Sequence, residues 1–162
     1  MTENAEDTMV IELEWGEVTI NLRPDLAPNH VARIKELVRE SFYDGIVFHR
    51  VMDGFMAQTG DPTGTGTGGS GQKLGAEFTQ ENFGRGTVGM ARANHPDTGD
   101  SQFFICLDDA SFLNGQYTVW GEVTEGMEHV DRIKKAPAGS QSGQVEDPDA
   151  MVRVRIKADI DA

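Results

Sequence analysis

The chain has 162 residues, which fits one domain of ordinary size and hardly two. Its formal net charge is −13, from 27 acidic and 14 basic side chains, and this balance argues against a nucleic-acid binder, which needs a basic face. A chain of this length buries about 65–70% of the surface that its unfolded form exposes, so it needs no disulfide bonds.

The first part of the chain predicts a β-hairpin followed by a helix. Apolar and polar residues alternate in residues 11–15 and again in 18–22, and Gly16-Glu17 between them predicts a two-residue turn. Pro28 then begins a segment whose apolar residues recur at helical spacing, and Asp44-Gly45 supplies its end.

Short strands separated by glycine-rich turns are predicted for the rest of the chain. Residues 46–60 are expected to form two strands with a turn at Asp53-Gly54, and residues 60–75 a glycine-rich loop. Residues 127–133 predict a second, shorter helix. Further strands are predicted at the apolar runs 88–91, 103–107, 117–123 and 151–160.

These elements indicate a mainly β protein with a single domain over residues 1–162, in which the polar residues 1–8 are expected to be frayed. Many short strands and two helices are typical of a sandwich or of a closed barrel with helical caps. The sequence contains no internal repeat and no linker.

Several short motifs in the sequence match known functional motifs but lack the surrounding elements or partner residues that those functions require. Residues 64–69 and 84–89 match Gly-x-Gly-x-x-Gly, but neither segment follows a strand and opens a helix, as a dinucleotide site requires. Gly99-Asp100-Ser101 lacks the histidine and acid partners of a hydrolase nucleophile. The four histidines form no ligand pair, so we expect no metal site.

One block is difficult to explain as core and turn alone. Residues 48–61 read FHRVMDGFMAQTGD and place Arg50 inside an apolar strand, where an arginine needs either an acidic partner or a functional site. Residues 89–105 and 112–121 again combine a glutamine with aromatic residues, although any one of these aromatic side chains is also typical of a core.

These blocks resemble the cyclophilin family of peptidyl-prolyl cis–trans isomerases, in particular its bacterial and archaeal members. The similarity runs in order from about Val18 to Ile160, and its most specific segments are FHRVMDGFMAQTGDPTGTGTGG, SQFFICL and FLNGQY. The resemblance implies a closed eight-stranded antiparallel β-barrel capped by two α-helices. It also implies an active groove on the outside of the barrel, and no cofactor.

The same resemblance implies the residues of the groove. Arg50 matches the catalytic arginine of the family. The implied proline pocket is lined by Phe55, Met56, Phe104 and Leu113. The other implied binding residues lie beside the peptide or at the groove margin: His49, Gln58, Ala91, Arg92, Gln102, Phe112 and Tyr117.

The implied reaction needs no nucleophile, metal or cofactor. Rotation about a peptide bond meets a barrier of ~18–20 kcal/mol, because the nitrogen shares its lone pair with the carbonyl group. In the twisted geometry the prolyl nitrogen becomes pyramidal and accepts a hydrogen bond, which a fixed guanidinium can donate. We therefore expect an isomerase that assists the folding of proline-containing polypeptides. The alternative is a proline-peptide binding module or chaperone with little turnover.

Three positions depart from the pattern of many family members. Phe112 stands where many eukaryotic members have tryptophan, and Tyr117 stands where they have histidine. Arg92 replaces a common asparagine, at a position where the family uses mainly the backbone. These departures leave the expected catalysis intact and predict that any binding of cyclosporin is weakened.

The charge and the one cysteine indicate where the protein works. Only five of the basic residues are lysines, and an acid-rich, lysine-poor surface suggests salt adaptation; the alternative is an ordinary acidic cytosolic protein. Cys106 has no partner for an internal disulfide and lies in an apolar run, which predicts a buried thiol and a cytoplasmic location. The acidic start and the absence of an apolar run of about 18 residues predict neither a signal peptide nor a membrane span.

We predict a monomer whose thermal midpoint rises with salt over the molar range, because salt screens the mutual repulsion of a −13 charge. Melting curves in low and multimolar potassium chloride measure the effect. A midpoint that is unchanged or lower in high salt contradicts the prediction.

Overall fold

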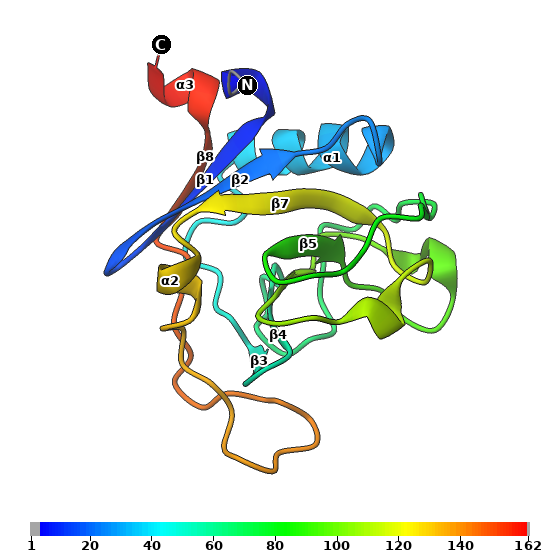
Figure 1. Cartoon of the computed structure of the whole chain (residues 1–162). Helices are drawn as coiled ribbons and strands as arrows, with labels where there is room; N and C mark the ends of the chain where they lie inside the picture. The colour runs from blue at the N-terminus through cyan, green and yellow to red at the C-terminus, as the bar shows by residue number, and fades with distance from the viewer. Residues whose placement is uncertain (1–3, 162) are drawn as a thin grey trace.

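The computed structural model, which describes residues 4–161, consists of one antiparallel sheet of eight strands with a few helices packed on it (Figure 1). The strands are β1 Thr8–Leu13, β2 Gly16–Leu22, β3 Arg50–Met52, β4 Met56–Thr59, β5 Thr87–Met90, β6 Phe103–Cys106, β7 Val119–Glu125 and β8 Arg153–Ile156. The helices are α1 Pro28–Arg39, α2 Met127–Val130 and α3 Lys157–Asp161, with the 3₁₀ helices η1 Ala5–Asp7, η2 Pro96–Thr98 and η3 Ser111–Leu113. No helix between residues 4 and 161 is long and apolar enough to cross a lipid bilayer.

The sheet curls into a half-barrel with the strand order β3-β4-β6-β5-β7-β2-β1-β8. In the described part of the chain, no ladder joins the two end strands β3 and β8. Instead, the segments that precede them meet through single backbone bonds: Phe48 N donates to Asp149 O (2.8 Å) and Met151 N donates to Ile46 O (2.9 Å). The eight antiparallel strands are confirmed, but the expected closed barrel is not found. The reason is that residues 136–149 are polar, lack alternation and contain prolines, so they form no regular strand.

The predicted hairpin is present, but its turn lies two residues earlier than expected. Leu13 pairs with Gly16, so Glu14 and Trp15 form the turn. A Cβ atom on Gly16 would lie 2.5 Å from the ring of His129, and Trp15 Nε1 donates to the carbonyl oxygen of His129 (2.9 Å). Gly16 therefore permits a close contact inside a strand rather than the turn itself.

Two apolar clusters lie on opposite sides of β6. The main core combines the buried face of α1 with buried side chains of β1, β2, β7 and β8. Because successive side chains of a strand point to opposite faces, Phe103 and Ile105 join the main core, whereas Phe104 and Cys106 point away from it. The second cluster, which we call the outer cluster, consists of Met56, Phe83, Phe104, Cys106, Ala110 and Val119.

The C-terminal elements differ from the sequence expectation. Helix α2 ends at Val130, three residues before the expected end, although Ile133 is buried as well. Strand β8 ends at Ile156, and residues 157–161 form α3 where the continued alternation predicted a strand. Within the predicted strand 151–160, Val152 is 49% exposed, because Met151 occupies the buried position before Val154 instead.

Ion pairs connect η1, α1 and α3, which lie together at the upper end of Figure 1. Lys35 Nζ lies 2.7 Å from Asp7, and Arg39 contacts both Glu6 (2.8 Å) and Asp159 (3.0 Å). Hydrogen bonds from Arg39 and Lys35 lower the pKa of the Glu6 carboxyl. Residues 5–8, expected to be frayed, thus form a 3₁₀ turn and the start of β1, while residues 1–3 lie outside the described residues.

Helix α1 begins without a capping side chain of its own, because its N-cap residue is Ala27. Glu77, from the long loop between β4 and β5, supplies the cap. Its carboxylate accepts hydrogen bonds from the backbone N–H groups of Asn29 (3.2 Å) and His30 (2.8 Å). The same carboxylate lies 2.6 Å from Nδ1 of the buried His30 ring. Glu77 therefore fixes the loop to the main core as well as capping the helix.

We predict that Glu77→Ala lowers the free energy of unfolding by about 2 kcal/mol, because it removes the cap and leaves the His30 ring without its partner. Denaturant unfolding measures the loss. Glu36→Ala is the control: this exposed carboxylate of α1 pairs with Arg33 at 3.2 Å, so its loss changes stability by less than about 0.5 kcal/mol. Equal losses in the two variants would rule out the capping role.

Candidate active site

Arg50 lies on the end strand β3, and neutral groups fix its side chain. Nε donates to the carbonyl oxygen of Ser142 (2.9 Å), Nη1 donates to Oε1 of Gln58 (3.2 Å), and Nη2 lies 3.7 Å from Sδ of Met52. Among residues 4–161, no carboxylate forms an ion pair with Arg50. The structure therefore does not support Arg50 as the partner of an acid. Its guanidinium, which carries five N–H donors, keeps donors for a ligand.

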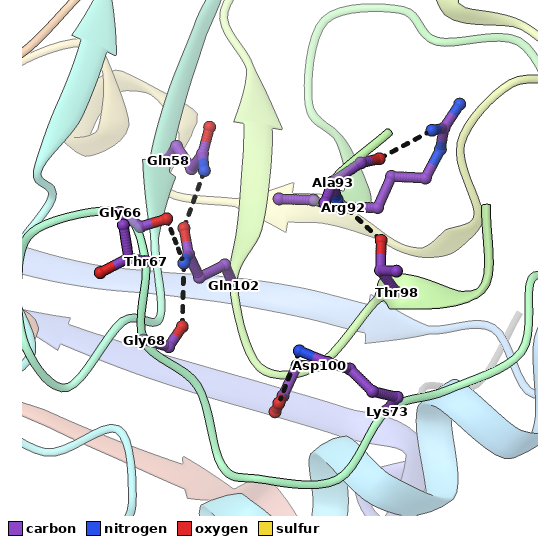
Figure 2. Close-up of a pocket in the computed structure, with 11 residues that line it drawn as sticks. Gln58, Gly66, Thr67, Gly68, Lys73, Arg92, Ala93, Thr98, Asp100 and Gln102 are labelled. Carbon is purple, nitrogen blue, oxygen red and sulfur yellow. Dashed lines mark hydrogen bonds and ion pairs between the residues drawn. The ribbon is translucent and has the colours of Figure 1, made fainter. Parts of the chain in front are cut away.

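The side chain of Gln58 begins a series of hydrogen-bonded amides that leads away from Arg50. Nε2 of Gln58 donates to Oε1 of Gln102 (2.9 Å). Nε2 of Gln102 in turn donates to the carbonyl oxygens of Gly66 and Gly68, both at 3.0 Å, and Figure 2 shows Gln102 between Gln58 and this loop. The series directs the oxygen of Gln58 toward Arg50.

Beside Arg50, an apolar cavity of about 120 Å³ opens over the outer cluster. Arg50, Gln58 and Phe104 are successive partners across β3, β4 and β6, so their side chains share one face of the sheet. The cavity brings together nine of the twelve residues that the resemblance implies: Arg50, Phe55, Met56, Gln58, Ala91, Arg92, Phe104, Leu113 and Tyr117.

Aromatic packing positions Phe104, which is 5% exposed at the base of this cavity. Its ring stacks on Phe83 with the ring centres 5.8 Å apart and meets Tyr117 edge-on at 5.6 Å. On the neighbouring strand β5, a Cβ atom on Gly89 would lie 2.8 Å from Phe104 and 2.7 Å from Phe83. The positions of both rings therefore require a glycine at residue 89.

A second cavity of about 310 Å³ adjoins the first and shares Gln58, Ala91 and Arg92 with it (Figure 2). The side chain of Arg92 turns back on the protein: Nε donates to the carbonyl oxygen of Gln116 (3.0 Å), and the guanidinium lies 4.7 Å from the ring centre of Tyr117. The two cavities adjoin at these shared residues: most residues that line the first are aromatic or aliphatic, whereas most that line the second, which we call the polar end, are polar or glycine. The other residues of the polar end are Gly66, Thr67, Gly68, Lys73, Ala93, Thr98, Asp100 and Gln102.

Three of the implied residues lie outside the apolar cavity. Gln102 lines the second cavity, as described above. His49, expected at the groove margin, lines neither cavity; it is 6% exposed and lies against Gly66, and burial lowers the pKa of its ring. Phe112 is 65% exposed on η3 and packs against Phe55, with the ring centres 5.5 Å apart.

Sequence reasoning missed the contribution of residues 142–143, which lie in none of the predicted elements. The carbonyl oxygen of Ser142 accepts a hydrogen bond from Arg50, 92 positions earlier in the chain. Gly143 has a φ of 74°, and a Cβ atom there would lie 2.6 Å from Met52. Any residue type can supply a backbone carbonyl, so Ser142 leaves no signal in the sequence. The glycine at residue 143 is a weak signal, because its positive φ and its close approach to Met52 both favour glycine.

Cys106 is confirmed as a buried thiol, and burial raises its pKa to about 12, which suits packing rather than nucleophilic chemistry. Within residues 4–161, no three side chains of His, Cys, Asp or Glu gather in a way that could hold a metal ion.

Comparisons with known sequences agree with this geometry. The family described as "Cyclophilin type peptidyl-prolyl cis-trans isomerase/CLD" matches residues 8–157. A protein of Brucella suis named "Probable peptidyl-prolyl cis-trans isomerase" is 52% identical over 166 residues, covering 95% of this chain and 84% of that protein. "Peptidyl-prolyl cis-trans isomerase B" of Bacillus subtilis is 46% identical over 117 residues, covering 71% of this chain and 81% of its own length.

Solved structures show the same fold. A cyclophilin from Hirschia baltica superimposes with a TM-score of 0.85 at 27% identity, covering 98% of this chain and 77% of that one. A cyclophilin-type isomerase from Cryptosporidium parvum, crystallised in the presence of the dipeptide Ala-Pro, gives a TM-score of 0.84 at 29% identity, covering 92% and 98%. With a family match over nearly its whole length and close relatives of the same kind, the chain belongs to the cyclophilin family of peptidyl-prolyl cis–trans isomerases.

Proposed function

We propose that the chain accelerates rotation about X–Pro peptide bonds at the apolar cavity, with Arg50 as the catalytic residue. The observation that carries this proposal is a guanidinium beside an apolar cavity, fixed by the neutral oxygens of Ser142 and Gln58. Since no carboxylate in the described residues neutralises it, its charge and its remaining N–H groups act on the substrate.

The chemistry consists of rotation without breaking a covalent bond. Cis and trans X–Pro differ by only ~0.5–1 kcal/mol, but the barrier between them makes exchange slow. As the bond twists, the prolyl nitrogen regains its lone pair, becomes pyramidal and accepts a hydrogen bond from Arg50. The same guanidinium holds the carbonyl group that follows proline. Lowering the barrier by ~7 kcal/mol would accelerate exchange roughly 10⁵-fold, which positioning and electrostatics together can supply.

The apolar walls have a different task, which is to hold the proline ring while the preceding carbonyl turns. Phe104 forms the base of the cavity, and Phe55, Met56 and Leu113 complete its walls. We infer that the flanking residues of the peptide extend along the second cavity, with the backbone of the peptide beside Ala91 and Arg92.

Proline-containing polypeptides that are folding are the substrate class we propose. The structure from Cryptosporidium parvum that was obtained in the presence of the dipeptide Ala-Pro supports a proline-containing substrate. We also propose that the protein acts as a monomer in the cytoplasm and is adapted to salt. The buried, unpaired Cys106 and the net charge of −13 support these proposals.

Exchange NMR on an Ala-Pro peptide tests the proposed function directly. Substoichiometric protein should broaden or merge the cis and trans signals, because catalysed exchange becomes faster than the uncatalysed rate. Peptide binding without faster exchange would instead support a proline-peptide binding module.

We predict that Arg50→Ala lowers kcat by about 10²-fold or more and changes KM by less than about threefold, because Arg50 contributes most when the prolyl nitrogen is pyramidal. Arg50→Lys should restore little activity, because one ammonium group cannot reproduce the planar fork. Exchange NMR and melting curves measure activity and folding in parallel. A folded Arg50→Ala protein with near-native exchange would remove Arg50 from the catalytic role.

Phe104→Ala serves as the contrasting variant for Arg50. It empties the base of the cavity, so it should weaken peptide binding as well as turnover. If Phe104→Ala and Arg50→Ala changed KM and kcat by the same factors, the proposal that Phe104 binds the proline ring while Arg50 catalyses its rotation would be wrong.

We predict that Phe112→Trp strengthens cyclosporin binding while barely changing isomerisation, because phenylalanine offers no indole N–H donor. Phe112 is 65% exposed, so the larger ring can be placed without repacking a core. Titration calorimetry with cyclosporin compares the two proteins. Binding by the native chain that is already as tight as that of the variant would contradict the prediction.

A further inference from the structure

Asp61 is a buried carboxylate just after β4, and its partners are the backbone and side chain of the loop that follows it. It is 1% exposed. Oδ1 accepts hydrogen bonds from N (2.8 Å) and Oγ1 (2.7 Å) of Thr63, and Oδ2 accepts from N of Thr65 (3.1 Å) and N of Gly66 (2.5 Å). Burial alone would raise the pKa of Asp61, but bonds from Thr63, Gly68 and Gly66 bring it well below its usual range. The loop is therefore wrapped around an ionised carboxylate.

Because the N–H groups of the loop point toward Asp61, its carbonyl groups are exposed on the opposite side. With its N–H groups turned toward Asp61, the loop presents the carbonyl oxygens of Gly66 and Gly68 to Gln102 (Figure 2). A carbonyl oxygen only accepts hydrogen bonds, so the NH₂ end of the Gln102 amide must face the loop.

The orientation of one amide then determines that of the next. With its NH₂ group toward the loop, Gln102 offers Oε1 to Nε2 of Gln58. Gln58 is left with Oε1 facing Nη1 of Arg50. If both amides were reversed, the NH₂ group of Gln58 would face the guanidinium, and two donors would oppose each other.

We propose that Asp61 is a positioning residue for Arg50, acting through the carbonyl groups of the loop and the two amides; the proposal rests on the proposed function of Arg50. Asp61 lines neither of the two substrate cavities. Three groups in sequence connect it to the guanidinium of Arg50, each oriented by the one before it: the carbonyl groups of residues 66–68, the amide of Gln102 and the amide of Gln58.

A second carboxylate, that of Asp100, holds the later part of the loop, so a change at Asp61 can be tested for its effect on the earlier part alone. Asp100 accepts hydrogen bonds from N (2.7 Å) and Oγ (2.6 Å) of Ser70 and from N of Gly71 (3.2 Å). Residues 70–71 are thus fixed independently of Asp61. A change at Asp61 should disturb residues 63–68 and leave the rest of the loop in place.

Asp61→Asn is the direct test. Asparagine keeps one oxygen for Thr63 but presents an NH₂ group to the N–H groups of Thr65 and Gly66, so the carbonyl oxygens of residues 66–68 lose their orientation. We expect kcat on a short Ala-Pro peptide to fall about tenfold and KM to change by a smaller factor, because residues 66–68 line only the second cavity and the apolar cavity that holds the proline ring is untouched.

Gln102→Met distinguishes positioning from a general loss of structure. Methionine has a similar length but donates no hydrogen bond, so it breaks the connection between the loop and Gln58. In this background Asp61→Asn should lower kcat by less than about twofold, whereas a purely structural effect would be the same in both backgrounds. The side-chain NMR signals of Gln58 and Arg50 should also shift in Asp61→Asn.

Asp131→Asn is the matched control. Asp131 pairs with Arg85 at 2.6 Å and lines neither cavity, so the variant removes the same charge without touching the connection. Its kcat and the Gln58 and Arg50 signals should match those of the native protein.

Equal kcat losses in the two backgrounds, or Gln58 and Arg50 signals that do not shift, overturn the proposal. If the native chain shows no catalysed exchange, the proposed function fails instead, and the NMR signals still decide whether Asp61 orients Arg50. If Asp61→Asn does not fold, Gly68→Ala replaces it, because a Cβ atom there would overlap Oδ1 of Asp61 and displace the same carboxylate.

Discussion

Side chains along β4 and β6 alternate between two apolar clusters, and the geometry of the candidate active site depends on this alternation. Ala57 and Ile105 lie in the main core, whereas Met56 and Phe104 lie in the outer cluster. Two short strands are thereby packed on both faces. A slip of one residue would turn every buried side chain to the wrong face, so the register is strongly fixed. Gln58, on the same strand as Met56, inherits its position from this packing.

The end of the sheet gives Arg50 its particular surroundings. An end strand leaves one row of backbone groups without a ladder partner, and here the segment around Ser142 and Gly143 approaches that row. The groups that reach Arg50 are a carbonyl oxygen, an amide oxygen and a thioether. These acceptors fix the direction of the guanidinium without cancelling its charge, which a carboxylate at the same distance would do.

Local patterns in the sequence predict most of the strands, the long helix and the main members of the site. Alternation places β2, helical spacing places α1, and the block around Arg50 places the apolar cavity. The predictions fail where contacts between segments distant in sequence determine the local structure. The ring of His129 explains why a glycine stands at residue 16, beyond the turn, and neither the turn position nor this contact is visible from local alternation.

Within the site, the sequence identifies side chains but not the bonds that orient them. Gln58 and Gln102 are evident as amides among aromatic residues, yet the orientation of each amide, and so the atom of Gln58 that faces Arg50, depends on two carbonyl oxygens of the loop. These bonds depend on the conformation of the loop backbone. Many different sequences can adopt the same backbone conformation, so the sequence does not reveal where a loop carbonyl points. Burial of His49 has the same origin, since the folded loop covers a residue that the motif alone places beside the groove.

The close approach of Gly89 to Phe83 and Phe104 links three positions on different segments into one steric unit. Any residue larger than glycine at position 89 requires both rings to move away or to be replaced by smaller side chains. Substitutions at these positions should therefore be accepted jointly rather than singly as the family diverges. The depth of the apolar cavity is then a property of all three positions, and it changes only when several of them change together.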